Sequence, residues 1–170
     1  ANSLDFGDFG VASHLTVATC GVIFVLSLIG FGAKAGFVPM HIWLPEAHPA
    51  APSHISALMS GVMIKIGIYG ILRTMTFLGQ PQHWWGPTLM IIGFAGALLG
   101  ISLALFQRDL KRSLAYSSIE NVGLIVLALG VGLWGVTSGH TTVAVLGLSG
   151  GMLHIWNHAL MKSLMFLCSG

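Results

Sequence analysis

The chain has 170 residues, of which 55% are hydrophobic and only 7% are charged, with a formal net charge of +2. A water-soluble domain carries about 25% charged residues, so this composition excludes an ordinary soluble domain and predicts a protein that lies in lipid. The lysines and arginines are too few and too scattered for a nucleic-acid-binding surface.

The ends of the chain suggest a piece of a larger protein. The first ten residues lack the basic flank and apolar core of a signal peptide. The chain begins without Met and stops inside an apolar run. We therefore expect residues 1–170 to form a single membrane domain that is an internal fragment of a longer subunit.

A helix needs about 20 apolar residues to cross the hydrocarbon layer, and stretches of this kind follow one another along the chain. The first covers residues 14–35 and meets Gly36 and Pro39, which predict a broken helix because glycine weakens a helix and proline removes a backbone donor. A short amphipathic stretch over 40–48 continues this crossing. The second span covers 53–78, with Ser53 as its predicted N-cap.

The second half of the chain adds three more spans. The third covers 88–106 and follows the paired Trp84 and Trp85, which are typical of a membrane interface. The fourth covers 114–136 and the fifth 141–170. The predicted fold is therefore an all-α, polytopic transmembrane helix bundle of about five spans, the first of them a broken helix.

The loop at residues 108–112 holds the only cluster of positive charge in the sequence. Cytoplasmic loops of membrane proteins carry an excess of lysine and arginine, so we expect this loop to face the cytoplasm. Because successive spans alternate in direction, the loop at 46–52 is expected on the same side.

Ionisable side chains inside a membrane cost about 2.5–3.5 kcal/mol each on insertion scales, so each of them requires a reason. Lys65 lies twelve residues from Ser53, too deep for its ammonium to reach either interface easily. Lys34 lies beside the predicted helix break, whose free carbonyls could stabilise its charge. If the helix ended there, Lys34 would instead extend to the interface.

His154, His158 and Lys162 recur at intervals of four residues, which places them on one helical face. A histidine that titrates near neutral pH beside a buried lysine is a reasonable proton relay. The alternative is a stripe of hydrogen bonds between helices, aided by Asn157. Glu120 either pairs with one of the lysines or reaches the lipid headgroups.

The remaining polar side chains, among them His48 in a flank, are explained by solvation at the membrane interface. No metal or haem is expected, because His154 and His158 have no acidic or cysteine companion nearby. No iron–sulfur or flavin motif is present in the sequence. We therefore expect no cofactor.

Four segments of the chain resemble a known family. Residues 30–52, GFGAKAGFVPMHIWLPEAHPAAP, resemble the broken-helix signature of the antiporter-like membrane subunits of respiratory complex I, membrane-bound hydrogenases and multisubunit cation/proton antiporters. The segments MIKIGIYGILR, DLKRSLAYSSIENVG and HIWNHALMKSLMFLCSG follow in the family's order. SIENVG and HPAAPSH are most like the hydrogenase-4 component B and formate hydrogenlyase membrane subunits.

The resemblance implies a proton path through Lys34 at the broken helix, Lys65 in the next helix and a central relay of His154, His158 and Lys162. We also expect Glu120 to belong to this path in the case where it pairs with one of the lysines. The family's upstream glutamate and downstream charged residue have no counterpart in these residues.

We expect a proton-translocating, non-catalytic subunit of an energy-converting redox complex of the hydrogenase-4 or formate hydrogenlyase type. It would lie in the inner (plasma) membrane of a bacterium and assemble with other membrane subunits and a soluble redox arm. The alternatives are a subunit of complex I or of a cation/proton antiporter, and a structural membrane scaffold whose buried charges only lock helix packing.

Overall fold

The structure of the chain, a computed structural model, describes residues 15–170. His14, the expected start of the first span, lies outside the described residues. The elements in chain order are α1 (Val17–Ala35), α2 (Trp43–Ala50), α3 (Ser53–Leu58), the π-helical turn η2 (Met59–Met63), α4 (Ile64–Leu78), α5 (Trp85–Leu105), α6 (Leu110–Thr137) and α7 (Thr141–Cys168). Over this range no strand occurs, so the predicted all-α class is confirmed.

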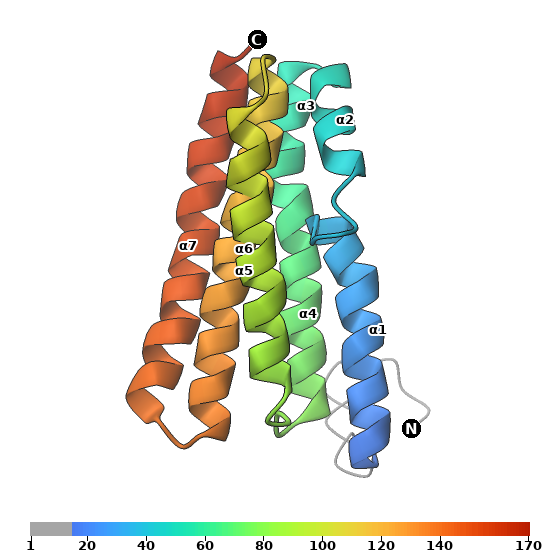
Figure 1. The fold of residues 1–170 in the computed structure, drawn as a ribbon, viewed down its shortest axis with the longest axis vertical. Helices are drawn as coiled ribbons and strands as arrows, with labels where there is room; N and C mark the ends of the chain where they lie inside the picture. The colour runs from blue at the N-terminus through green and yellow to red at the C-terminus, as the bar shows by residue number, and fades with distance from the viewer. Residues whose placement is uncertain (1–14) are drawn as a thin grey trace.

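The long helices lie side by side with nearly parallel axes (Figure 1). Four helical stretches in the described part are long and apolar enough to cross a membrane: Val17–Ala35, Ser53–Leu78, Trp85–Leu105 and Leu110–Thr137. The expected fifth crossing is α7, which has 28 residues, like α6, and packs along it. His154, His158 and Lys162 interrupt its apolar run.

The first crossing is broken where the sequence predicts. Gly36 ends α1 in the left-handed conformation, with φ 84° and ψ 35°. The N–H groups of Gly36 and Phe37 bond to the carbonyls of Ala33 and Gly32, which forms a Schellman cap. After a turn the chain continues as α2, and the indole N–H of Trp43 donates to the Ala33 oxygen at 2.9 Å. The two halves of the crossing are thus tied together at the break.

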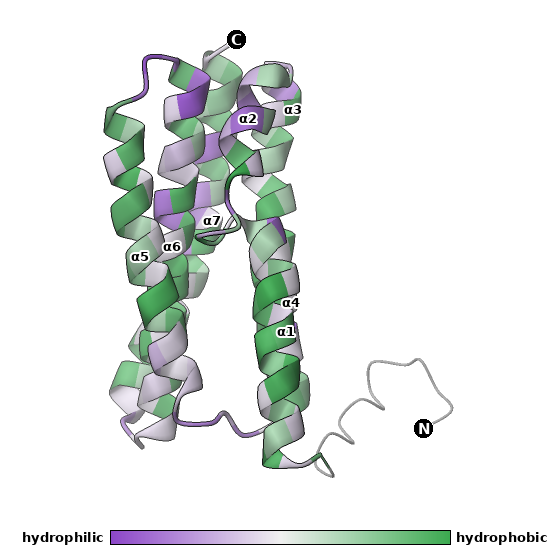
Figure 2. Cartoon of the chain, turned by 45° about the vertical axis from the view of Figure 1, so that its right-hand side comes forward, coloured by the Kyte–Doolittle hydropathy of each residue, from purple (hydrophilic) through white to green (hydrophobic). Residues whose placement is uncertain are grey.

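The α2–α3 turn and the α5–α6 loop lie at the same end of the bundle, as the alternation of spans predicts. The Glu46 carboxylate pairs with the Arg112 guanidinium, and Lys111 Nζ donates to the Ala51 oxygen at 3.2 Å. Asp109 caps α6 by accepting the Arg112 N–H at 2.8 Å. Hydrophilic residues gather in the half of the bundle that holds α2 and α3 (Figure 2).

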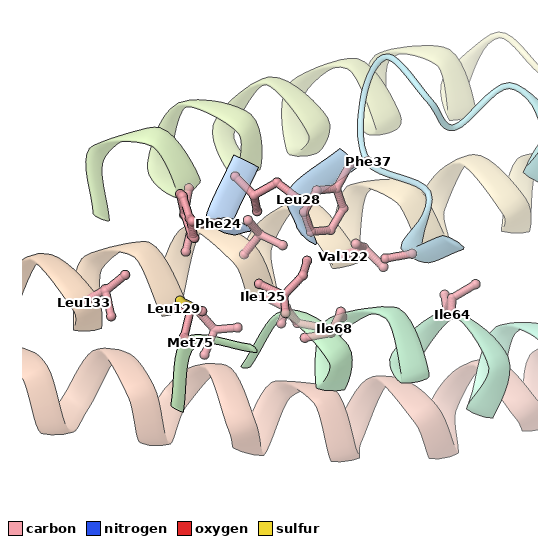
Figure 3. Packing of buried hydrophobic residues seen from close by; sticks show 14 of the residues in the cluster. Phe24, Leu28, Phe37, Ile64, Ile68, Met75, Val122, Ile125, Leu129 and Leu133 are labelled. Atoms are coloured by element: carbon pink, nitrogen blue, oxygen red, sulfur yellow. The ribbon is translucent and has the colours of Figure 1, made fainter. Parts of the chain in front are cut away.

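The core of the bundle lies between α1, α4 and α6 (Figure 3). It is formed by buried apolar side chains, including Phe24, Leu28, Ile68, Ile125 and Leu129. Such side chains exclude both water and lipid from the centre of the bundle, so a polar group placed there has to find its partners within the protein.

Several glycines of the spans are close-packing positions. A Cβ at Gly67 would lie 2.6 Å from the Phe31 oxygen of α1. A Cβ at Gly147 would lie 2.4 Å from the Gly132 nitrogen of α6. These helices therefore approach each other through their backbones.

Two local predictions are wrong. Trp85 is fully buried and stacks on Phe24 with ring centroids 4.5 Å apart, so it is a core residue, whereas its neighbour Trp84 is exposed. Ser53 is the first residue of α3, and its predicted place as N-cap belongs to Pro52. The second span also contains the π-helical turn η2, for which the sequence gives no signal.

Candidate functional site

Lys65 lies at the middle of the second span with its side chain buried. The π-helical turn before it changes the backbone bonding: the Ile64 N–H bonds to Met59, five residues back, rather than to Ser60. The Ser60 oxygen accepts a hydrogen bond from the Lys65 ammonium. On its outer side Lys65 borders an apolar groove of about 470 Å³ between α4 and α7.

Hydrogen bonds at Ser60, Ser118 and Leu114 link Lys65 to Lys162 across the bundle, and at Ser60 the link runs through the residue itself, because Lys65 bonds to its carbonyl and Ser118 contacts its hydroxyl. The hydroxyl of Ser60 lies 3.0 Å from the hydroxyl of Ser118 on α6. Ser118 donates to the Leu114 oxygen at 2.9 Å, and Lys162 Nζ on α7 donates to the same oxygen at 3.0 Å. Both serines are fully buried, and Lys162 is 1% exposed. Two ammonium groups from different helices are thus joined inside the protein.

His154, His158 and Lys162 of α7 face the interior of the bundle. His158 is buried, like Lys162. His154 is half-buried, and its Nε2 lies 3.1 Å from Asn121 Oδ1 on α6. The rings of His154 and His158 are nearly parallel, with centroids 6.2 Å apart. Asn157, which the alternative interpretation adds to this stripe, is exposed on another face.

His48 is the residue that the sequence interpretation missed. The expectation that His48 lies in a solvated flank is wrong, because its side chain is 0% exposed. Its ring stacks on Phe166 with centroids 4.4 Å apart and 14° between the planes. It lies within electrostatic range of both Lys65 and Lys162. Among the described residues no group bonds either ring nitrogen of His48 or of His158.

Lys34 is not part of this buried group. It lies in the last turn of α1 and its side chain is exposed. The carbonyls of Gly32 and Ala33, next to the break, are bonded by backbone N–H groups and the Trp43 indole instead of by the lysine. A Cβ on Gly67 of α4 would lie 2.8 Å from the Ala35 nitrogen, so Lys34 lies at nearly the same depth as Lys65.

Glu120 lies at the edge of the group. It is half-buried and accepts a hydrogen bond from the Ser117 hydroxyl at 3.3 Å. It is within electrostatic range of Lys162, although the two form no ion pair among the described residues. Glu120 therefore moderates the charge of the site without neutralising a lysine directly.

The chemistry available to this group is proton exchange. Lysine ammonium groups donate protons, neutral imidazole both donates and accepts, and hydroxyls do both. Within residues 15–170 no three His, Cys, Asp or Glu side chains gather in a way that could hold a metal ion. What the geometry offers is a cluster of buried groups that can hold and exchange protons inside an apolar bundle.

Comparisons with known proteins show which family the chain resembles. Residues 2–170 match the family described as NADH:quinone oxidoreductase/Mrp antiporter, TM. The chain is 51% identical over 173 residues to hydrogenase-4 component B of Escherichia coli (strain K12), with 100% of the chain and 26% of that protein covered. It is 42% identical over 148 residues to formate hydrogenlyase subunit 3 of the same organism, with 87% and 24% covered.

A further relative belongs to a different complex. NADH-quinone oxidoreductase subunit N of Desulforudis audaxviator (strain MP104C) is 38% identical over 173 residues, with 99% of the chain and 32% of that protein covered. The chain thus spans about a quarter to a third of the length of these relatives.

Proposed function

Because the chain belongs to the NADH:quinone oxidoreductase/Mrp antiporter transmembrane family, the antiporter-like membrane subunits of complex I and hydrogenase-type complexes, we propose that it carries part of a proton-translocation path. The observation behind this proposal is the pair of buried lysines, Lys65 and Lys162, whose ammonium groups bond to the carbonyls of Ser60 and Leu114 while the hydroxyls of Ser60 and Ser118 contact each other. Ionisable groups inside membranes are costly, and they commonly mark ion and proton pathways.

In this proposal protons move between Lys65, Lys162 and the histidines His158 and His154 of α7. Like charges repel strongly in a low-dielectric interior, so the arrival of a proton on one lysine favours its departure from the other. Bridging water completes the transfers where two groups are too far apart for a direct hydrogen bond.

Lys34 and Glu120 are the outer members of the proposed path. The exposed ammonium of Lys34, nearly level with Lys65, is available to groups of the full-length subunit beyond the described helices. Glu120 lies within electrostatic range of Lys162 and adds a carboxylate at the edge of the cluster.

We further propose that the parent complex is of the hydrogenase-4 or formate hydrogenlyase type. The identities of 51% and 42% to those two subunits exceed the 38% to NADH-quinone oxidoreductase subunit N. Residues 1–170 would then be one membrane domain within a longer multi-pass subunit of a bacterial inner membrane. Other membrane subunits and a soluble redox arm would supply the driving reaction. A complex I or antiporter subunit is the alternative.

A structural scaffold is the second candidate function. It is favoured by the fact that Lys65 and Lys162 both donate to backbone oxygens, as a residue that only locks helix packing would. The variant Lys65→Met in the full-length subunit separates the two. A relay predicts an assembled complex without proton uptake in proteoliposomes, whereas a scaffold predicts damaged assembly on native gels.

Lys111→Met is the matched control for this experiment. Lys111 also donates to a backbone oxygen, that of Ala51, but it lies at the end of the bundle. We expect this variant to keep both assembly and proton uptake. Equal losses in the Lys65 and Lys111 variants would contradict the proposed relay.

A further inference from the structure

His48 is a buried titratable side chain that the relay described above does not use. Its imidazole is 0% exposed, and within the described part of the chain neither of its nitrogens has a hydrogen-bond partner. Buried polar atoms are nearly always hydrogen-bonded. Packing alone gives no reason for a histidine here, because an apolar ring would fill the same space without an unsatisfied nitrogen.

The position of His48 continues the polar face of α7. Phe166 follows His158 and Lys162 at four-residue intervals, so it lies on the same face of that helix. Phe166 lies about 6 Å along the helix axis from Lys162, and the His48 ring stacks on it at 4.4 Å between centroids. Lys65 and Lys162 are both within electrostatic range of the ring.

The backbone around His48 leads to the charged end of the bundle. The His48 oxygen accepts a hydrogen bond from the Ser56 hydroxyl at 3.0 Å, which fixes α2 against α3. Glu46, two residues earlier in α2, is exposed and pairs with Arg112. The short helix α2 therefore carries the buried His48 and, two residues earlier, an exposed carboxylate paired with Arg112.

We infer that His48 is a further proton carrier, which connects the buried lysine pair to the end of the bundle at Glu46. This inference rests on the proposed function. Imidazole accepts a proton on one ring nitrogen and releases a proton from the other. Each transfer therefore returns the ring to its neutral form, and no bond to carbon is made or broken.

The test uses the full-length subunit in its complete complex, reconstituted into proteoliposomes and driven by the complex's own redox reaction. His48→Phe keeps an aromatic ring against Phe166 but cannot carry a proton. We expect the variant to assemble, to keep its redox rate with artificial acceptors and to lose proton uptake by about tenfold or more. His54→Phe, at an exposed position in the first turn of α3, is the matched control and is expected to change nothing.

A second variant separates a proton carrier from a packing residue. Phe166→Leu removes the stacked ring but leaves the imidazole of His48, so a carrier role predicts uptake close to that of the parent protein. A packing role predicts the reverse pattern, with normal uptake in His48→Phe and damaged assembly in Phe166→Leu. That reverse pattern overturns the inference.

The outcome for Lys162→Met, measured in parallel, distinguishes this inference from the proposed function. If proton uptake is lost in Lys162→Met but normal in His48→Phe, only the inference about His48 is contradicted. If uptake is normal in both variants, the proposed function is contradicted as well. If His48→Phe does not assemble, His48→Gln is measured in its place and is expected to assemble without uptake. Normal uptake in the Gln variant, or failed assembly of both variants, assigns His48 a structural role and contradicts the inference.

Discussion

The hydroxyl groups of Ser60 and Ser118 lie 3.0 Å apart in the interior of the bundle, although they come from the second span and from α6. The carbonyl of Ser60 accepts from Lys65, and the hydroxyl of Ser118 shares the Leu114 oxygen with Lys162. This contact between two hydroxyls therefore turns two separate buried lysines into one connected unit.

Removal of either hydroxyl is expected to slow proton transfer between the lysines. Ser60→Ala and Ser118→Ala each interrupt the connection while changing little volume. The double variant is expected to be no worse than a single one, because both residues act in the same link and their effects are not additive. Proton uptake in proteoliposomes at equal complex content measures this.

Ser149→Ala is the control for the serine variants. The hydroxyl of Ser149 lies on the exposed side of α7 and bonds only within its own helix, so its removal should leave uptake unchanged. Normal uptake in the Ser60→Ala and Ser118→Ala variants would show that the observed link is not used.

Close packing between α1 and α4 makes a second prediction, on stability. Gly67→Ala would place a Cβ 2.6 Å from the Phe31 oxygen and 2.8 Å from the Ala35 nitrogen. Such overpacking costs about 1–3 kcal/mol, so the melting temperature in detergent should fall. Gly30→Ala is the matched control, because nothing lies within 4 Å of its Cβ and alanine favours a helix by about 0.5–1 kcal/mol. Equal melting temperatures would contradict the observed packing.

The loop over 108–112 is expected to face the cytoplasm because of its positive charge. Lys111 donates to the Ala51 oxygen in the α2–α3 turn and Arg112 pairs with Glu46 of α2, which places Pro52 at the same end. In a variant without native cysteines, Arg108→Cys and Pro52→Cys should both resist an impermeant thiol reagent added outside intact cells. Ser138→Cys, in the turn between α6 and α7 at the other end, should react readily. The opposite labelling pattern would show that every span crosses the membrane in the opposite direction.

The architecture is largely predictable from the sequence because lipid imposes simple requirements. A spanning helix needs a long apolar run and must satisfy its own backbone bonds. Such runs are visible without any structure, and so is the break at Gly36 and Pro39, since these two residue types interrupt helices for local reasons. The polar face of α7 is predictable for a similar reason, because the four-residue spacing of His154, His158 and Lys162 depends only on the geometry of one helix.

The connection within the site was not predictable in the same way. The burial of His48 depends on Phe166, which lies far along the chain, and one sequence does not show which helices meet. The available signal was the spacing of Leu44 and His48, which places both on one face of α2, where both are buried. Ser60 and Ser118 resemble ordinary small residues of membrane helices. The Ser60 carbonyl accepts from Lys65 because the π-helical turn moves the backbone bond of Ile64 from Ser60 to Met59.

Proton uptake by proteoliposomes that contain the complete complex with Lys162→Met tests the central claim most directly. Methionine keeps the apolar bulk of the lysine stem and removes the proton site, while Lys162→Arg keeps the charge on a group that does not release its proton in proteins. We predict that both variants assemble, keep the redox rate with artificial acceptors and lose proton uptake. A Met variant that assembles and takes up protons at the parent rate would contradict the account and leave Lys162 with a structural role.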